Sequence, residues 1–195
     1  MTGLVTVLGS GAMSNDIEGI AEIDAMLVIG SNTTETHPVI GLRMQQAVKN
    51  HGTEIIVADP RRIKLADGAR LWLSQKPGTD GALINAICHV ILRENLTDED
   101  FIKNRTENFE VFAESLAHCT PKWAEKITGV PAADIEEAAK IYASAERAAI
   151  FYTMGITQHT SGTDNVKALA NLALMTGNLG KPSAGLNPLR GQNNV

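Results

Sequence analysis

Short continuous apolar runs alternate along the chain with longer segments in which apolar residues recur every three or four positions. The apolar runs lie at 25–30, 54–58, 70–73 and 148–152. Their length and their lack of polar interruptions are typical of strands that are buried on both faces. These runs therefore predict the strands of a mostly parallel sheet.

The segments between these runs have the apolar spacing of helices. Such spacing covers 39–51, 164–175 and a stretch opened by residues 77–80. Between 97 and 145 the pattern is helical throughout, with capping signals at Thr97 or Asp98 and at Thr120 before a proline. The alternation predicts an α/β fold with a doubly wound, mostly parallel sheet flanked by helices, and a helical excursion around 97–145.

Polar loops follow the carboxyl ends of the predicted strands. They occupy 30–38, 58–62, 76–80 and 153–160. In a doubly wound sheet these strand ends lie along one edge, and ligands bind in the crevice at that edge. We therefore expect the loops to form a single site, although they are scattered in the sequence.

Composition narrows the class of protein. The 195 residues include 22 acidic and 17 basic side chains, and the net charge of −5 does not favour an electrostatic nucleic-acid binder. With 44% hydrophobic residues, 1–195 is predicted to be a single α/β domain. The segment 177–195, rich in glycine and asparagine, is predicted to be an irregular tail that leads to a missing domain.

The cysteines and the N-terminal segment indicate the compartment. Cys88 and Cys119 are far apart in the sequence, and neither belongs to a closely spaced cysteine pair. The sequence therefore predicts no metal ligand in this chain. The apolar run 4–8 is too short for a signal peptide or a membrane span. We expect no membrane segment in this chain and a reducing, cytoplasmic environment.

Side chains in the predicted loops have chemistry suited to a nucleotide. Asn32 has amide donors and acceptors just before a helix whose N-terminus attracts phosphate. Asp59 follows a strand, where a carboxylate commonly holds ribose hydroxyls, and Arg61 is close enough to reach a phosphate. Asp80 has two acceptors side by side, which match the ring N–H and exocyclic amine of guanine but not adenine.

Each of these residues also has a purely structural interpretation. Asp80 and Thr79 are common helix caps, and for either residue alone capping is the better-supported interpretation. Asp59 belongs to an ordinary turn dipeptide, and His37 before a proline is more often a hydrogen-bond partner than a catalyst. The segment 9–14 is a weak match to a dinucleotide fingerprint. The nucleotide hypothesis therefore depends on the loops acting together.

Several stretches resemble the catalytic alpha subunit of formate dehydrogenases, which are molybdenum or tungsten oxidoreductases with two molybdopterin guanine dinucleotides (MGD). These stretches are 8–15, 28–38, 57–62, 77–80, 154–159 and 186–195, in the family's order. Nitrate reductases share many of the elements, and the sequence RGQNNV at 190–195 favours the formate enzymes.

The resemblance implies a dinucleotide-binding-like domain, the third of four, that holds one MGD. The residues it assigns to cofactor binding are Asn32, Glu35, Asp59, Arg61, Gly78, Asp80, Met154, Gly155, Gln158, Gly191 and Gln192. Arg190 matches the family's active-site arginine, and a guanidinium fork suits the carboxylate of formate.

The family's metal ligand, a cysteine or selenocysteine, and its 4Fe-4S cysteines have no counterpart in these 195 residues. The resemblance therefore implies an internal fragment that is inactive alone. Its expected partners are the remaining domains of the alpha subunit, electron-transfer subunits and formate. Two alternatives stay open: another MGD oxidoreductase, such as a nitrate reductase, and a free-standing nucleotide-binding module.

Overall fold

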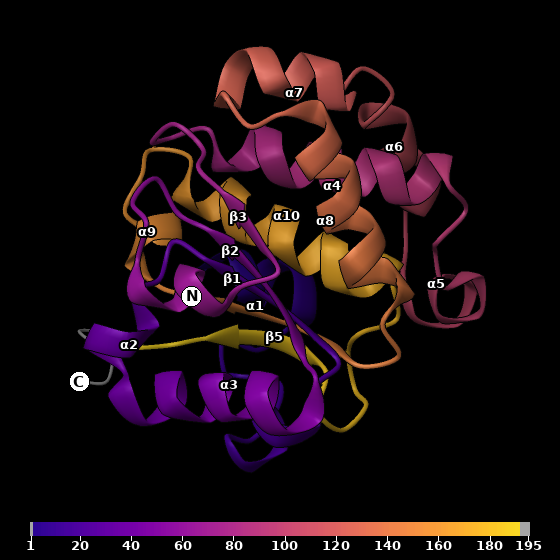
Figure 1. Ribbon diagram of the computed structural model, residues 1–195. Helices are drawn as coiled ribbons and strands as arrows, with labels where there is room; N and C mark the ends of the chain where they lie inside the picture. The colour runs from indigo at the N-terminus through magenta and orange to yellow at the C-terminus, as the bar shows by residue number, and fades with distance from the viewer. Residues whose placement is uncertain (1, 192–195) are drawn as a thin grey trace.

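The computed structural model describes residues 2–191, which form a five-stranded, entirely parallel sheet flanked by helices. The strands are β1 (Ala25–Ile29), β2 (Glu54–Ala58), β3 (Leu71–Leu73), β4 (Ala148–Tyr152) and β5 (Gly185–Pro188). They lie in the order β3-β2-β1-β4-β5, so the chain builds the sheet outward from β1 in both directions. The predicted doubly wound α/β fold is confirmed (Figure 1).

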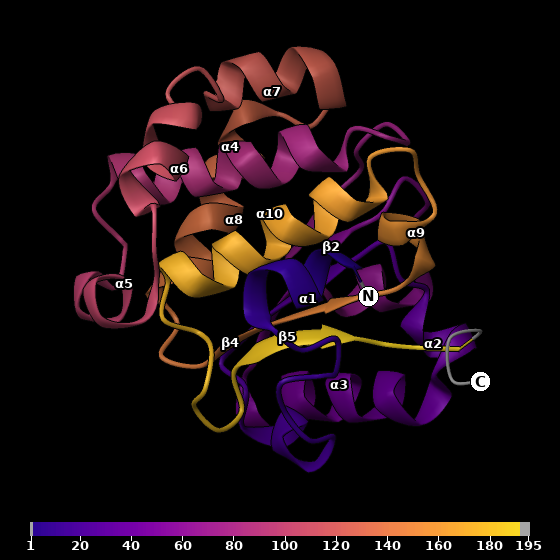
Figure 2. The same ribbon diagram turned by 180° about the vertical axis from the view of Figure 1, so that it is seen from behind.

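Right-handed crossovers between parallel strands place helices on both faces of the sheet. The helix α3 (Pro38–His51) connects β1 to β2 and covers one face together with the 3₁₀ turns η1 (Glu18–Glu22) and η2 (Lys64–Gly68). The later crossovers run in the opposite direction across the sheet, and their helices cover the other face (Figures 1 and 2). These helices are α4 (Asp80–Arg93), α8 (Ala132–Ser144) and α10 (Gly162–Met175).

The remaining helices are short. The predicted helical excursion forms α5 (Glu99–Arg105), α6 (Phe109–Ser115) and α7 (Pro121–Thr128). The N-terminal helix α1 (Thr2–Leu8) packs on α10. Two further helices, α2 (Thr33–Thr36) and α9 (Met154–Thr157), are single turns. Both predicted caps are confirmed. Asp98 accepts a hydrogen bond from Phe101 N at 2.8 Å, and Thr120 accepts one from Trp123 N at 3.2 Å.

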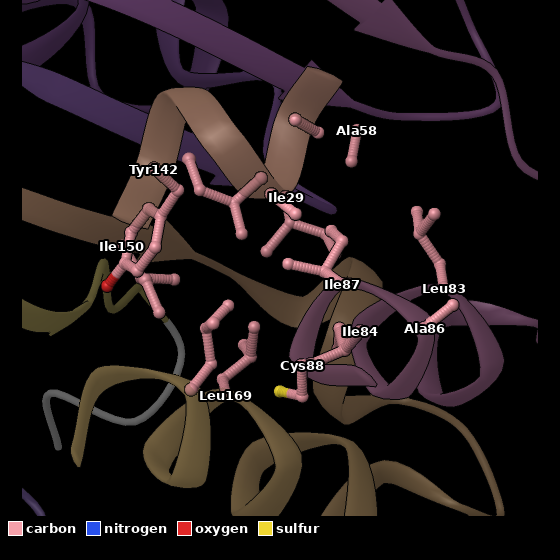
Figure 3. Close-up of a cluster of buried hydrophobic side chains, with 14 of the residues drawn as sticks. Ile29, Ala58, Leu83, Ile84, Ala86, Ile87, Cys88, Tyr142, Ile150 and Leu169 are labelled. Carbon is pink, nitrogen blue, oxygen red and sulfur yellow. The ribbon is translucent and has the colours of Figure 1, made fainter. Parts of the chain in front are cut away.

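Alternate residues of the strands build two separate cores. Leu27 and Ile29 of β1 pack toward α4, α8 and α10, whereas Met26 and Val28 pack toward α3. Figure 3 shows Ile29 and Ala58 from the sheet facing Leu83 and Ile87 of α4. Because every residue of β1 and β4 is buried, these strands lack polar positions, which explains the continuous apolar runs in the sequence.

An ion pair joins the amino ends of β1 and β4. The Arg147 guanidinium donates through Nε and Nη2 to the two carboxylate oxygens of Asp24, each at 3.2 Å. The backbone N–H of Asp24 donates to Arg147 O at 2.9 Å. The two strands are therefore held in register at this edge by side chains as well as by the ladder.

One expectation about the tail was wrong, because residues 185–188 form β5 instead of an irregular segment. The strand is stabilised from both sides. It pairs with β4, and on its outer edge Leu186 N donates to Ser14 Oγ at 2.9 Å while Ser14 N donates to Leu186 O at 3.3 Å. The segment 9–14 therefore covers a sheet edge and is not a strand-to-helix phosphate loop. Among residues 2–191, no helix is long and apolar enough to cross a membrane.

The carboxyl ends of β1 and β4 approach each other through two glycines. Gly155 N donates to Gly30 O at 3.1 Å, and Thr153 Oγ1 donates to the same oxygen at 2.6 Å. A Cβ placed on Gly155 would lie 2.5 Å from Gly30 O, and Gly30 itself has φ +57°. Only glycine fits at either position, and the loops on the two sides of the sheet diverge from this contact.

We expect Gly155→Ala to lower the free energy of unfolding by about 1–3 kcal/mol, because the methyl group would push β1 and β4 apart where they are closest. Thermal and urea unfolding monitored by circular dichroism measures the change. Gly68→Ala is the matched control, because a Cβ there meets no atom within 4 Å. Equal stability of the two variants would contradict the close-contact account.

Candidate functional site

The carboxyl ends of all five strands bring polar loops to one edge of the sheet. The four predicted loops follow β1 to β4, and a fifth, 189–191, follows β5. In Figure 1 the short helices α2 and α9 lie on this side of the sheet. The structure therefore brings the predicted loops together and adds the loop that contains Arg190.

Asp80 is the first residue of α4 and is only 4% exposed. Its Oδ1 accepts a hydrogen bond from Gln75 Nε2 at 3.0 Å, whereas the hydroxyl of Thr79 donates to Lys76 O at 2.7 Å. Neither Thr79 nor Asp80 caps the helix, so the capping interpretation was wrong. The reason is that both polar groups find partners in the loop that precedes the helix.

Gln75 is the residue of this site that sequence reasoning missed. It is 1% exposed, and its Oε1 has no hydrogen-bond partner in the described part of the chain. The one available signal was a long polar side chain two positions after a strand, at the edge where ligands bind. An unpartnered buried acceptor beside a buried carboxylate is unusual, because each such group costs free energy.

Asp59 forms the turn that its sequence suggested. Its Oδ1 accepts a hydrogen bond from Arg61 N at 2.9 Å, and Arg61 Nε lies 3.8 Å from the same oxygen. Trp72, expected to be a core residue, donates through Nε1 to Asp59 O at 3.0 Å, and its ring lies under the Arg62 guanidinium at 5.6 Å. The carboxylate is buried, while the side chain of Arg61 is 75% exposed and free to reach a ligand.

The loops after β1 and β4 contribute smaller polar groups. Asn32 occupies the N-cap position of α2, where its backbone carbonyl accepts the amide hydrogens of Glu35 and Thr36. The side chain of Glu35 is exposed. Beyond β4, Gln158 Nε2 contacts Met154 Sδ at 3.3 Å, and both side chains are exposed beside Gly155. These residues lie at the predicted edge but make few contacts with the rest of the chain.

His37 ties the loop after β5 to the start of α3. Since a carbonyl only accepts, His37 Nε2 donates to Arg190 O at 2.8 Å, and Nδ1 of the ring lies 2.9 Å from Thr36 Oγ1. The prediction that His37 is a hydrogen-bond partner is confirmed. Burial raises the pKa of Tyr152, and the positive charge of Arg190 opposes this shift. Gln192 lies outside the described residues.

Two surface hollows differ in their relation to this edge. The larger, about 920 Å³, lies at the opposite edge of the sheet, between α1, α5 and the C-terminal end of α10. The smaller, about 450 Å³, runs between α4 and α10 and begins at Gly78 and Thr79. Within residues 2–191, no group of three or more His, Cys, Asp or Glu side chains could hold a metal ion.

Comparison with known proteins finds relatives that are longer than this chain. The chain is 55% identical over 195 residues to the F420-dependent formate dehydrogenase subunit alpha of Methanocaldococcus jannaschii and 46% identical to formate dehydrogenase H of Escherichia coli. These matches cover all of this chain but 29% and 27% of the relatives. Acetylene hydratase from Pelobacter acetylenicus superposes with a TM-score of 0.82 at 29% identity, over 90% of this chain and 24% of that enzyme.

The chain therefore spans less than a third of the length of these relatives. The family model described as "Molybdopterin oxidoreductase" matches residues 6–194, which is almost the whole chain. The match includes every strand of the sheet and all the loops at its carboxyl edge. The chain belongs to the molybdopterin oxidoreductase family.

Proposed function

We propose that this chain is the domain of a formate-oxidising enzyme that holds one molybdopterin guanine dinucleotide, reads its guanine with Asp80 and contributes Arg190 to the substrate site. One observation carries the proposal. Asp80 follows β3 and Arg190 follows β5, which are the two outer strands of the sheet. At a strand spacing of about 4.8 Å, these outer strands are about 19 Å apart, a span suited to an extended dinucleotide.

The residues along this edge fit such a cofactor. Asp80 is buried, and of its two oxygens Oδ1 accepts from Gln75, while Oδ2 has no partner among the described residues. The first amides of α4 have no side-chain cap, which leaves them open to a ligand. Gly78 has φ +80° and open space where a side chain would be, so a ligand can approach the backbone there. The strand order 3-2-1-4-5 is also that of dinucleotide-binding folds, which supports a Rossmann-like description.

The middle of the edge would hold the rest of the cofactor. We assign the ribose and phosphate groups to Asp59, Arg61 and Asn32, whose loops lie between β3 and β4 in the sheet order. The further assigned contacts are Glu35, Met154, Gly155, Gln158, Gly191 and Gln192. The exposure of the Arg61 and Gln158 side chains supports this, because their outer polar groups are accessible to a ligand.

When bound, the molybdenum or tungsten of the cofactor supplies the two-electron chemistry that converts formate to carbon dioxide. Arg190 would bind the formate carboxylate through two parallel N–H···O bonds and stabilise its negative charge. The hydrogen bond from His37 fixes the backbone of Arg190, so the side chain that carries the guanidinium extends from a fixed backbone position. Tyr152, buried beside Arg190, would limit water around the substrate.

The other components would belong to the remainder of the enzyme. We assign to it the metal ligand, the 4Fe-4S cluster and the contacts with electron-transfer subunits. The relatives, which are named as formate dehydrogenases or their alpha subunits, support this assignment. A reducing cytoplasmic location is supported by the two buried thiols Cys88 and Cys119, which are not bonded to each other.

Asp80→Asn is expected to weaken the preference for guanine by on the order of 1–3 kcal/mol, because an amide donor would face the ring N–H of the base. Calorimetric titration of the 195-residue chain with GMP and with AMP measures the preference. Asp100→Asn on the exposed face of α5 is the matched control. Unchanged GMP binding by the Asp80 variant would exclude a base-reading role.

Arg190→Ala in the complete enzyme is expected to reduce turnover of formate roughly 10- to 100-fold, because a charged pair of hydrogen bonds to the substrate is lost. The pterin content should stay near that of the parent enzyme. His37 binds the backbone carbonyl of residue 190, and removing the Arg190 side chain leaves this hydrogen bond and the loop in place. Formate kinetics and pterin fluorescence after extraction give the two readouts. Loss of the pterin would instead make Arg190 a cofactor ligand.

A further inference from the structure

We propose that Gln75 is a positioning residue that sets the base selectivity of Asp80. This inference rests on the proposed guanine site. Gln75 does not need to touch the base to act, because its Nε2 donates to Asp80 Oδ1 at 3.0 Å. It fixes the orientation of the carboxylate and leaves Oδ2 and the second lone pair of Oδ1 for the two donors of guanine.

The alternative position of the carboxylate shows why a positioning residue is needed. Asp80 is the first residue of a 14-residue helix, whose first amides have no intrahelical partner and attract carboxylates. Thr79 does not satisfy them, because its hydroxyl donates to Lys76 O. Without the hydrogen bond from Gln75, Asp80 is expected to turn toward these amides and to cap the helix, away from the base.

The amide oxygen of Gln75 indicates that this side chain does not serve to stabilise the fold. Its Oε1 is buried and has no donor within the described residues. A buried unpartnered acceptor is unfavourable, whereas an apolar side chain of similar shape at the same place has no such cost. The amide is therefore best explained by what its Nε2 does for Asp80.

The two side chains also come from rigid elements. Gln75 follows β3 by two residues, and Asp80 begins α4, which packs into the main core. Both are almost fully buried, at 1% and 4% exposure. Because the pair is ordered before the ligand arrives, binding does not have to immobilise the carboxylate, and this increases affinity for the matching base.

Gln75→Met tests the inference, because it keeps the length of the side chain and removes the donor. The ratio of GMP to AMP affinity of the 195-residue chain is expected to fall roughly fivefold to tenfold, which is the worth of about one hydrogen bond. The midpoint of thermal unfolding should change little. Gln46→Met on the exposed face of α3 is the matched control and should keep the full ratio.

Gln75→Glu adds a readout that a merely structural role would not produce. Two carboxyl groups at this distance repel each other strongly when both are ionised. As the pH falls, the pair takes up one proton and shares it. The shared proton restores a hydrogen bond to Asp80 Oδ1. The GMP preference of this variant is therefore expected to be low at about pH 8 and to recover toward about pH 5, while that of the unsubstituted chain stays nearly constant.

The outcomes separate this inference from the proposed function. If the unsubstituted chain does not prefer GMP to AMP, the proposed function fails and this inference fails with it. If the unsubstituted chain prefers GMP and Gln75→Met keeps that preference, only the positioning role is overturned. Equal weakening of GMP and AMP by Gln75→Met, with no recovery of Gln75→Glu in acid, would also overturn it by showing a structural role.

Discussion

The close approach of Gly30 and Gly155 is the constraint on which the rest of the structure depends. Gly30 directly follows the central strand β1, and Gly155 lies in α9, just after the neighbouring strand β4. Their backbones are joined by a hydrogen bond of 3.1 Å, with no space for a side chain on either residue. The chain leaves this point toward β2 and β3 on one side and toward β5 on the other. The edge is therefore a continuous row of loops, with Asp80 at one end and Arg190 at the other.

Much of this fold could be predicted because its strands are buried on both faces. Continuous apolar runs located β1, β2 and β4, and the caps at Asp98 and Thr120 located two helices. The strand β5 could not be located, because Gly-Leu-Asn-Pro has no apolar run. It forms because β4 and Ser14 supply hydrogen-bond partners from distant parts of the chain, which a local pattern does not contain.

In the site, as in the fold, local sequence patterns predict some features, whereas others depend on residues that the local pattern does not contain. The positions of the loops followed from the strand ends, and His37 behaves as the structural hydrogen-bond partner that was expected. The role of Asp80 did not follow in the same way, because helix capping and base recognition require the same residue types at the same position. The structure shows only that the carboxylate of Asp80 accepts a hydrogen bond from Gln75 and that α4 has no side-chain cap.

The most direct test of the account is to map where a guanine nucleotide binds. Titration of the ¹⁵N-labelled chain with GDP, followed by amide chemical shifts, compares the two edges of the sheet in one experiment. The account predicts shifts confined to the loops at 30–37, 59–62, 75–80 and 153–158. Shifts around the 920 Å³ hollow at the opposite edge, near Asp98 and Lys181, or equal shifts with ADP, would contradict it.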